Sequence, residues 1–565
     1  MNAAAQLTRP VTSAPDAPSL LHRVNVRARS IAARLLGRTP EPTPDQNARE
    51  FIEFCRRHWP AAPAGDRPLI LMHQTAWYPS VLCYAFVSHA LARREDASLA
   101  SFGFGGTGRP LDELFAGFGA PNILGQRELR KHRPRAEQLA EQIFRGFKSR
   151  RDVANFSFEG VSLGDVVYDS YLRYHSCHTV DLNDRRLRDA VRDALLRFLA
   201  ARELLDSRKI AMILVDHAVY MDAGILSRLA ILRGIPVYQL PYQPVSLLRL
   251  DPVAFPHHVA GPDSPEAGQR TAKLALPYHH FRNVFAALPE AGRAERRKIG
   301  REKLENRLSG KFDFRVLFGG SAYARTEGPQ LLADTGRPRI VVMMHDFCDA
   351  PHAYRDLIFE DHFQWVVWLF GRVTHSSCDW YAKEHPNSAH DHAKAALNRR
   401  TTDELKTRFP HIRFLPPNVS NLQLIEEGVS AIFTGYGTVG HEFAYAGIPV
   451  VNAGDNPHIN YGFTYHPQTV EELAELVDGA GELRFTGDRA EIEEYAYLRY
   501  EHFYDRSFHT VQFVPPELER DPESFRKVNT SSIFRYASED PTLREAQLDE
   551  YLERLFSSGR HLLPE

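Results

Sequence analysis

The stretch from Ala431 to Phe463 reads AIFTGYGTVGHEFAYAGIPVVNAGDNPHINYGF and indicates the fold class of the chain. Its first three residues, Ala431-Ile432-Phe433, are apolar and long enough for one buried strand. A glycine-rich turn follows over residues 435–440, and residues 441–446 form a short predicted helix that a glycine and a proline end. A second strand begins at Val450. A strand, a glycine turn and a helix N-terminus in this order favour the binding of an anion such as phosphate.

The spacing of the glycines separates this turn from the commonest phosphate-binding motifs. No Lys-Ser or Lys-Thr pair follows them, so the turn is not a Walker A loop. The pattern G-Y-G-T-V-G is also offset from the dinucleotide fingerprint GxGxxG. Taken alone, the turn fits a phosphate site and a tight strand-to-helix connection without a ligand equally well. The rest of the chain must decide between them.

Length and composition predict two or three globular domains in a reducing compartment. The chain has 565 residues, a formal net charge of −2 and five cysteines without CxxC spacing. The small net charge argues against nucleic acid as a partner, and the scattered cysteines argue against disulfides and structural zinc. Because HExxH spacing is absent and HxH occurs only once, at residues 390–392, we expect no metal site. No apolar run reaches the ~18 residues of a membrane span, and no signal peptide is present, so we expect a cytoplasmic protein.

The N-terminal segment has a composition of its own. Prolines bracket residues 20–38, where leucine, valine and isoleucine alternate with arginine. This pattern is typical of a basic amphipathic helix, which could contact the anionic inner face of a membrane. A helix packed on its own protein, or a flexible leader, explains the pattern equally simply. We therefore treat residues 1–48 as a leader outside the folded core.

Beyond residue 68, strands alternate with helices in two series, which predicts mostly parallel sheets covered on both faces. We expect an α/β protein with two facing Rossmann-like domains and an interdomain cleft. Residues 241–337 are less regular and are assigned to the tail of the first domain and a crossover, and a helix is predicted over 354–370. The expected units are a leader (1–48), an N-terminal domain (49–330), a C-terminal domain (331–490) and a helical extension that could cross back to the first domain (491–565).

Polar residues that directly follow the strands are the candidates for chemistry, because ligands of open α/β sheets bind beyond the carboxyl ends of the strands. In the first half these residues are His73, Glu159, Asp165, Asp216 and His217. In the second half they are His345, Asp346, Lys383, His385 and the segment from Thr434 to Glu442.

Two motifs in the second half resemble a known family. The segments WYAKEHP (380–386) and LPPNVSNLQLIEEGVSAIFTGYGTVGHEFAYAGIPVV (415–451) resemble bacterial capsule and surface-polysaccharide glycosyltransferases of the GT-B type, a group that includes enzymes using CMP-Kdo. The family pattern is Lys-x-His-Pro, then Gly-Thr-x-Gly-x-Glu, then Gly-x-Pro-Val. Glu384 stands where relatives often have proline. A weaker likeness extends over residues 160–173 and 216–234.

The resemblance implies a GT-B-like fold and a nucleotide-sugar donor, with Kdo from CMP-Kdo as one candidate, and no other cofactor. Such a site stabilises the departing phosphate with backbone N–H groups and cationic side chains instead of a metal. The residues that the motifs assign to the donor are Lys383, His385, Gly437, Thr438, Val439, Gly440 and Glu442. Glu442 would accept hydrogen bonds from ribose hydroxyls; alternatively, it is an acid that only favours the helix dipole.

Catalysis is expected from the first half. Asp216 follows the buried strand AMILV and is adjacent to His217, and we predict that Asp216 acts with Glu159 as the partner acid or base. A carboxylate there could be a general base for an acceptor hydroxyl or a nucleophile. The CMP-Kdo enzymes retain configuration, which implies the nucleophile. Alternatively, Asp216 is a helix N-cap and Glu159 a solvated turn residue.

The resulting hypothesis is a glycosyltransferase that adds a sugar to a growing surface polysaccharide or glycolipid. Two alternatives remain. One is transfer of a polyol phosphate or phosphosugar, because polymerases of that kind share Lys-x-His-Pro. The other is a non-catalytic subunit that binds glycan or acts as a scaffold in a polysaccharide synthase.

Overall fold

The structure is a computed structural model that describes residues 45–60, 66–104, 109–240, 247–250, 252–254, 270–274, 281–310, 320–323, 329–353, 357–389, 393–502 and 531–559. The predicted amphipathic segment 20–38, and with it the proposed membrane contact, lies outside these residues. No helix in the described ranges is long and apolar enough to cross a bilayer.

The first unit is built on a six-stranded sheet in the order β3-β2-β1-β6-β7-β8. All neighbouring strands are parallel except β7 and β8. The chain order of the parallel strands therefore reads 3-2-1-4-5, a Rossmann-like order that reverses direction between β1 and β6. The strands are β1 (Leu69–His73), β2 (Ser98–Phe102), β3 (Asn122–Leu124), β6 (Ile210–Val215), β7 (Val237–Gln239) and β8 (Leu248–Leu250).

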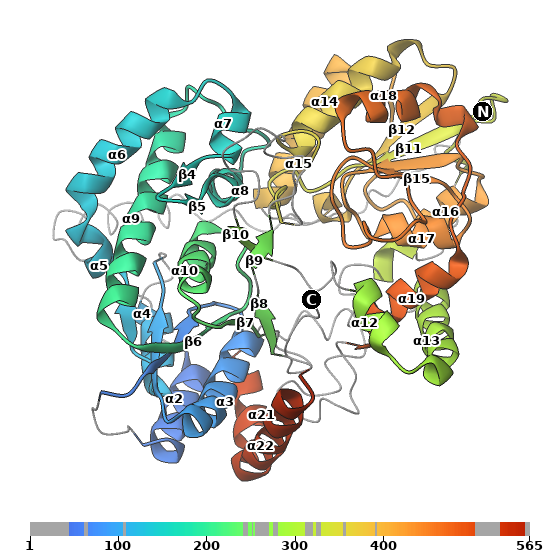
Figure 1. The fold of residues 1–565 in the computed structure, drawn as a ribbon. Helices are drawn as coiled ribbons and strands as arrows, with labels where there is room; N and C mark the ends of the chain where they lie inside the picture. Colours follow the sequence, from blue (N-terminus) through green and yellow to red (C-terminus); the bar gives the residue numbers. More distant parts are fainter. Residues whose placement is uncertain are drawn as a thin grey trace, which may run out of the picture.

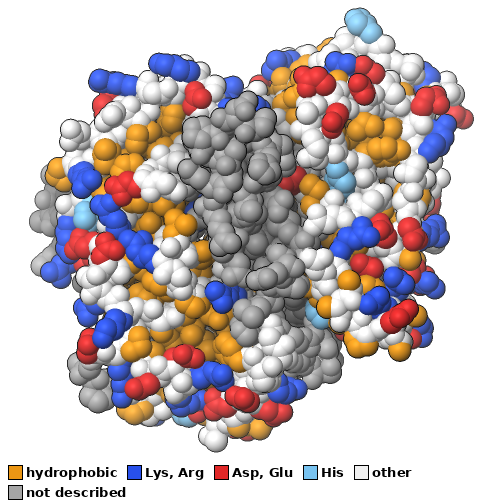
Figure 2. Space-filling view, in the orientation of Figure 1, with side chains coloured by type: hydrophobic (Ala, Val, Ile, Leu, Met, Phe, Trp, Pro, Cys, Tyr) orange, Lys and Arg blue, Asp and Glu red, His pale blue; other side chains and the backbone are white. Residues whose placement is uncertain are grey.

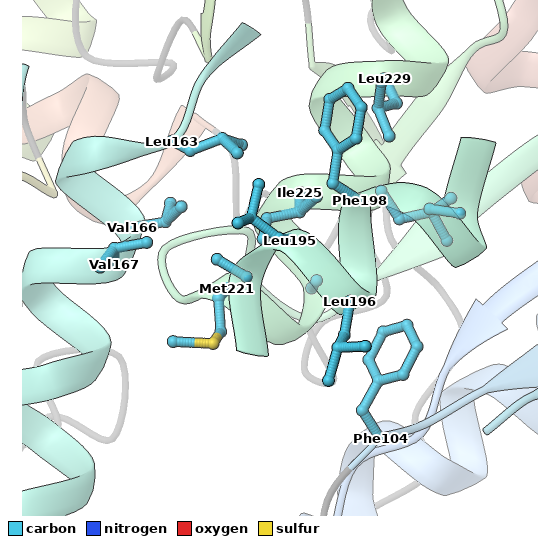
Figure 3. Packing of buried hydrophobic residues seen from close by; sticks show 14 of the residues in the cluster. Phe104, Leu163, Val166, Val167, Leu195, Leu196, Phe198, Met221, Ile225 and Leu229 are labelled. Carbon is cyan, nitrogen blue, oxygen red and sulfur yellow. The ribbon is translucent and has the colours of Figure 1, made fainter. Parts of the chain in front are cut away.

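Helices cover both faces of this sheet. Alternate strand residues point to opposite faces, so Leu71 and Ile213 pack in one core while Ile70 and Met212 pack in another. The first core lies under α8, α9 and α10, where Figure 3 shows Val166, Leu195 and Ile225 among its side chains. The helices are α3 (Tyr78–Glu95), α4 (Arg109–Gly117), α5 (Gln126–Lys131), α6 (Arg133–Gly146), α7 (Arg150–Ala154), α8 (Gly164–His175), α9 (Arg185–Ser207) and α10 (Met221–Leu232), preceded by α2 (Gln46–His58).

The second unit repeats this topology. Its five parallel strands are ordered β13-β12-β11-β14-β15, which is again 3-2-1-4-5 in chain order. The strands are β11 (Arg339–Met343), β12 (Asp379–Lys383), β13 (Arg413–Leu415), β14 (Ala431–Thr434) and β15 (Val450–Asn452). Its helices include α14 (His362–Arg372), α15 (Ala393–Arg408), α16 (Asn421–Glu426), α17 (Val439–Tyr445) and α18 (Val470–Asp478). The α/β fold class with two Rossmann-like units is thereby confirmed, and Figure 1 shows the two units side by side.

One predicted helix begins later than expected. The apolar periodicity favours a helix from residue 354, but α14 begins at His362 with Asp361 as its N-cap. The Asp361 carboxylate accepts a hydrogen bond from the Gln364 N–H at 2.8 Å, and the Tyr168 and Thr179 hydroxyls donate to it at 2.5 and 2.7 Å. These two donors come from the first unit, so a tertiary contact sets the start of the helix. Residues 354–356 lie outside the described ranges.

The boundary expected at residue 330 also differs from the structure. The helices α12 (Phe281–Ala287) and α13 (Glu290–Leu308) pack on α19 (Arg489–Tyr500), and Figure 1 shows all three within the second unit. Phe285 and Leu304 share a buried cluster with Tyr495. A Cβ on Gly300 would lie 1.9 Å from the Glu493 carbonyl oxygen, so the glycine lets α13 and α19 approach closely.

The last helices return to the first unit. Residues of α21 (Ile533–Ser538) and α22 (Pro541–Ser557) are buried in one cluster with α2 and α3. The Phe51 and Phe534 rings stack with centroids 4.6 Å apart, and Trp59 Nε1 donates to Glu545 at 2.7 Å. The chain therefore passes from the first unit to the second and back.

The two units meet at α8 and the segment after β11. His352 Nδ1 lies 2.6 Å from the Asp169 carboxylate, and both side chains are buried. The Tyr168–Asp361 hydrogen bond described above crosses the same junction. Charged side chains of both signs are interspersed over the visible face of both units (Figure 2), as expected from the small net charge.

Candidate functional site

The first candidate site lies where the strand order of the first sheet reverses. His73 ends β1, and Asp216 follows the neighbouring strand β6. His73 Nδ1 lies 3.2 Å from Asp216 Oδ1, and the same oxygen accepts the His217 backbone N–H at 2.8 Å. The His217 ring nitrogen Nδ1 is 3.4 Å from this oxygen. The point at which strand order reverses is where open α/β sheets bind ligands.

The Asp216 carboxyl is held in its ionised form. Burial by itself raises the pKa of this carboxyl. The charge of His217 and hydrogen bonds from His73 and Thr75 outweigh burial, so the pKa lies below its usual value. With a side chain 19% exposed, Asp216 is reachable and charged at neutral pH. It does not cap the following helix, because α10 begins at Met221 and Tyr220 is its N-cap.

Glu159 does not contact Asp216 among the interactions of the described residues. It occupies the turn of a hairpin between β4 (Ser157–Phe158) and β5 (Val161–Ser162), with a φ of +49°. Its carboxylate forms an ion pair with Arg202. The interactions recorded for Asp216 involve His73, Thr75, His217 and Gln239 instead. This placement favours a turn residue with a structural ion pair over the predicted partner acid or base.

The second candidate site lies at the corresponding point of the second sheet. His345 follows β11, and the predicted glycine turn follows the neighbouring strand β14. The Tyr436 N–H donates to His345 Nε2 at 3.2 Å, and the Gly437 N–H donates to Thr434 Oγ1 at 3.3 Å. The His345 ring stacks on His362, with centroids 4.5 Å apart and planes at 16°. The two candidate sites therefore occupy equivalent positions in two sheets of the same topology.

Two of the predicted phosphate-binding amides are available. The Gly440 N–H is already bonded to the Gly437 carbonyl at 3.0 Å. The N–H groups of Thr438 and Val439 donate to no residue that the structure describes. Gly440 has a packing role, because a Cβ there would lie 2.5 Å from His458 Cε1. The helix that follows has only seven residues, so its dipole should contribute less to the binding of a phosphate than these two amides do.

Lys383 ends β12 and His385 follows it, so both lie at the carboxyl ends of the strands of the second sheet. Met343, at the end of β11, is paired with Lys383 on one side and with Thr434 on the other. Lys383 and Thr434 therefore both lie beside the end of β11. Lys383 is buried, and burial lowers the pKa of its ammonium group to about 8 despite the attraction of Glu442. Burial, together with the nearby charge of His385, lowers the pKa of His345 to about 3. Lys383 is thus a buried cation at neutral pH.

Glu442 does not have the predicted surroundings. Its side chain is buried, one carboxylate oxygen pairs with Arg307 of α13, and the other accepts the Tyr323 hydroxyl. With both oxygens occupied by protein, the predicted contact with ribose does not fit this placement. The adjacent His441 is also internal, because its Nε2 lies 2.6 Å from the Tyr500 hydroxyl.

A short series of contacts joins the two sites across the units. The His217 and Tyr220 rings lie 5.8 Å apart, and the Tyr220 hydroxyl donates to the Asp349 carboxylate at 3.2 Å. The Asp349 backbone carbonyl accepts the Tyr436 hydroxyl at 3.1 Å, and the Tyr436 ring is 4.6 Å from His345. Residues adjacent to Asp216 thus connect to the glycine turn through Tyr220, Asp349 and Tyr436. Tyr220 and Tyr436 lie in segments that the sequence singled out, but no role was predicted for them, and Asp349 lies outside those segments.

Within the described residues, no group of three or more His, Cys, Asp or Glu side chains is arranged to hold a metal ion.

Comparisons with known proteins return distant structural likenesses. No protein-family model and no curated protein matches the sequence. Among solved structures, the chain is similar to KpsC of Thermosulfurimonas dismutans, a beta Kdo 2,4 transferase, with 11% identity over 51% of this chain and 79% of that chain and a TM-score of 0.30. It is also similar to the UDP-GlcNAc 2-epimerase of Neisseria meningitidis bound to UDP-GlcNAc (12% identity, 77% and 95%, TM-score 0.23). The glycosyltransferase SnogD of Streptomyces nogalater is a third (13% identity, 78% and 96%, TM-score 0.20).

Proposed function

We propose that this protein is a GT-B-type glycosyltransferase that binds a nucleotide-sugar donor in its second unit and transfers the sugar at Asp216. The observation that carries the proposal is the pairing of the two sites. Each lies where a 3-2-1-4-5 sheet reverses its strand order, and Tyr220, Asp349 and Tyr436 connect them. A reaction between two substrates requires two adjoining sites.

The second unit offers the groups that an anionic leaving group needs. Lys383 supplies a buried positive charge, and the N–H groups of Thr438 and Val439 supply two fixed donors. Departure of a nucleotide from the anomeric carbon leaves negative charge on its phosphate oxygens. Donors that are already oriented stabilise that charge without rearranging. The residues fit a nucleotide phosphate without requiring a metal ion.

The first unit offers a carboxylate with two imidazoles. As a nucleophile, Asp216 would attack the anomeric carbon, the bond from that carbon to the phosphate oxygen would break, and the nucleotide would leave with the electron pair. An acceptor hydroxyl would then attack the same carbon, the bond to Asp216 would break and free its carboxylate, and an imidazole of His73 or His217 would take the hydroxyl proton. Alternatively, an imidazole of His73 or His217 removes the acceptor proton in a single displacement, and Asp216 stabilises the resulting imidazolium. The lowered pKa of Asp216 suits both roles better than that of a direct general base.

The donor and acceptor are inferred from the motifs. Lys383-x-His385-Pro and Gly437-Thr438-x-Gly440-x-Glu442 resemble capsule enzymes, so we propose CMP-Kdo as the first donor to test. A growing surface polysaccharide or a glycolipid is the acceptor class. The Lys-x-His-Pro motif also occurs in polymerases that transfer polyol phosphate, and phosphorus in the product would identify that reaction instead.

The decisive experiment is a thermal-shift panel with CMP, CDP, UDP and GDP. A nucleotide at 100 times its Kd should stabilise the protein by about 2.7 kcal/mol, so the cognate nucleotide should raise the melting temperature and the others should not. Transfer from the matching donor is then measured with wild type and with Asp216→Asn. Loss of transfer with retained nucleotide binding supports the proposal. Absence of any shift, or unchanged transfer by Asp216→Asn, contradicts it.

A further inference from the structure

The protonation of the His345 ring is determined by the backbone of the glycine turn. The Tyr436 N–H donates to His345 Nε2 at 3.2 Å. A backbone N–H can only donate, so Nε2 must carry a lone pair and no hydrogen. In the neutral ring the hydrogen is then on Nδ1, because one ring nitrogen donates while the other accepts. Nδ1 itself has no hydrogen-bond partner among the described residues.

The ring is also held in place and kept neutral. It stacks on His362, whose ring is buried and whose two nitrogens find no partner in the described part of the chain. Gly435 lets the turn close on this pair, since a Cβ there would lie 3.2 Å from His345 Cδ2 and 3.2 Å from His362 Nδ1. Burial first, and then neighbouring histidines, lower the pKa of both rings. Neither ring therefore carries a charge at neutral pH.

We propose that His345 is a ligand-contacting residue of the donor site that donates its Nδ1–H to an oxygen of the nucleotide phosphate. This inference rests on the function proposed above and extends it to a residue outside the two sequence motifs. Lys383 and the turn that supplies the Thr438 and Val439 amides lie at the same edge of the sheet. A neutral donor adds a hydrogen bond without a second buried charge, whose desolvation would be costly.

Two substitutions separate this role from a structural one. His345→Asn places an amide N–H near the position of Nδ1 but removes the acceptor for Tyr436. His345→Gln places its carbonyl near Nε2, which keeps that acceptor and removes the Nδ1 donor. Isothermal titration with the nucleotide selected by the thermal-shift panel measures both. His411→Asn is the matched control, because the ring of His411 bonds to the Phe370 carbonyl at 2.8 Å and touches neither site.

We expect His345→Gln to bind the nucleotide roughly tenfold to hundredfold more weakly, the range for loss of a hydrogen bond to a charged group. His345→Asn should retain affinity within a few-fold of wild type, and His411→Asn should be unchanged. The opposite order, with His345→Gln binding well and His345→Asn poorly, would show that the ring only holds the turn. Equal binding by both variants would also overturn the inference and leave the proposed function intact. Wild type that binds none of the nucleotides would overturn both.

A spectroscopic measurement covers the case in which a variant fails to fold. Long-range proton–nitrogen correlation spectra of wild-type protein labelled with ¹⁵N-histidine distinguish the two neutral tautomers. The His345 signals, assigned by their absence in His345→Phe or by nucleotide-induced shifts, should show Nδ1 protonated and should move when the nucleotide binds. A ring protonated at Nε2, or signals that do not respond to the nucleotide, would overturn the inference.

Discussion

Lys383, which we propose binds the donor phosphate, should destabilise the protein when no ligand is bound. Its ammonium group is buried and is attracted by the Glu442 carboxylate, which is itself paired with Arg307 and Tyr323. Burial lowers the pKa of Lys383 from 10.5 to about 8. Between these values the unfolded chain binds more protons than the folded one, so the stability of the free protein should rise with pH over this range.

Replacing Lys383 should therefore affect stability and binding in opposite directions. Lys383→Met should raise the melting temperature of the free protein at pH 7, because the desolvation of a buried charge is removed. It should weaken nucleotide binding by roughly tenfold to a hundredfold. Wild-type affinity should fall as pH rises through about 8, the folded pKa of Lys383, and that dependence should disappear in the variant. Lys406→Met, at a side chain 46% exposed, is the control. A Lys383→Met protein that is both less stable and unchanged in affinity would contradict this account.

Gly440 permits a prediction about packing. A Cβ at this position would lie 2.5 Å from His458 Cε1, and His458 is buried. Gly440→Ala should lower the free energy of unfolding by about 1–3 kcal/mol, the usual range for overpacking. Gly371→Ala in α14 is a control, since the nearest atom to its Cβ would be 4.0 Å away. Alanine there should be neutral or stabilising by up to about 1 kcal/mol. Urea denaturation of both variants measures the difference.

At the scale of elements, the sequence predicted the strands and the turn of the second unit well. Short apolar runs bounded by glycine and proline mark β14 and β15, and the polar residues after them lie where parallel-sheet geometry requires. What could not be predicted depends on long-range contacts. Glu442 meets Arg307 and Tyr323, which are 135 and 119 residues away in the chain. Nothing local to Glu442 distinguishes an acid that faces ribose from one that faces a helix.

The same limit explains the misplaced boundaries. Helix α13 was expected with the preceding domain because it precedes the second sheet in the chain. Its partner α19 begins only at Arg489, and their close crossing at Gly300 is a property of both helices together. Likewise, α14 begins at His362 because hydroxyls of the first unit bind Asp361. The periodicity of apolar residues within one helix predicts neither its packing partner nor a start that depends on a contact with the other unit.

The Arg307–Glu442 pair fixes α13 on the second site and should dominate local stability. Removing one partner of a buried ion pair leaves an uncompensated charge, so Arg307→Ala should cost about 3–5 kcal/mol in the free energy of unfolding. The double variant Arg307→Met with Glu442→Met should recover much of that loss. The Arg301–Glu493 pair is a matched control, because Arg301 is 52% exposed. Arg301→Ala should cost less than about 1 kcal/mol. Additive losses in the double variant would show that the two residues are not coupled.

At the scale of the whole molecule, the proposed transfer should depend on how the two units are aligned. The Tyr220 hydroxyl binds Asp349 across the junction at 3.2 Å. Tyr220→Phe should leave nucleotide affinity unchanged, because the donor groups all belong to the second unit. It should reduce the rate of transfer by roughly two- to tenfold, the equivalent of one hydrogen bond to a carboxylate that is largely exposed to solvent. Tyr174→Phe, which loses a hydrogen bond to Asp222 within the first unit, is the control. If Tyr220→Phe binds the nucleotide more weakly than wild type, Tyr220 affects the donor site itself, which contradicts this prediction.

The return of α21 and α22 to the first unit has a consequence for the integrity of the protein. Two covalent links run between the units, one between residues 274 and 281 and one between residues 502 and 531. A protease that nicks the first link leaves the second unit attached to two helices that remain embedded among α2 and α3. The cleaved material should elute as a single particle on gel filtration and separate into fragments only in denaturant. The second half of the chain is therefore held to the first unit in two ways, by the peptide link that enters the second unit and by the packing of α21 and α22 on α2 and α3.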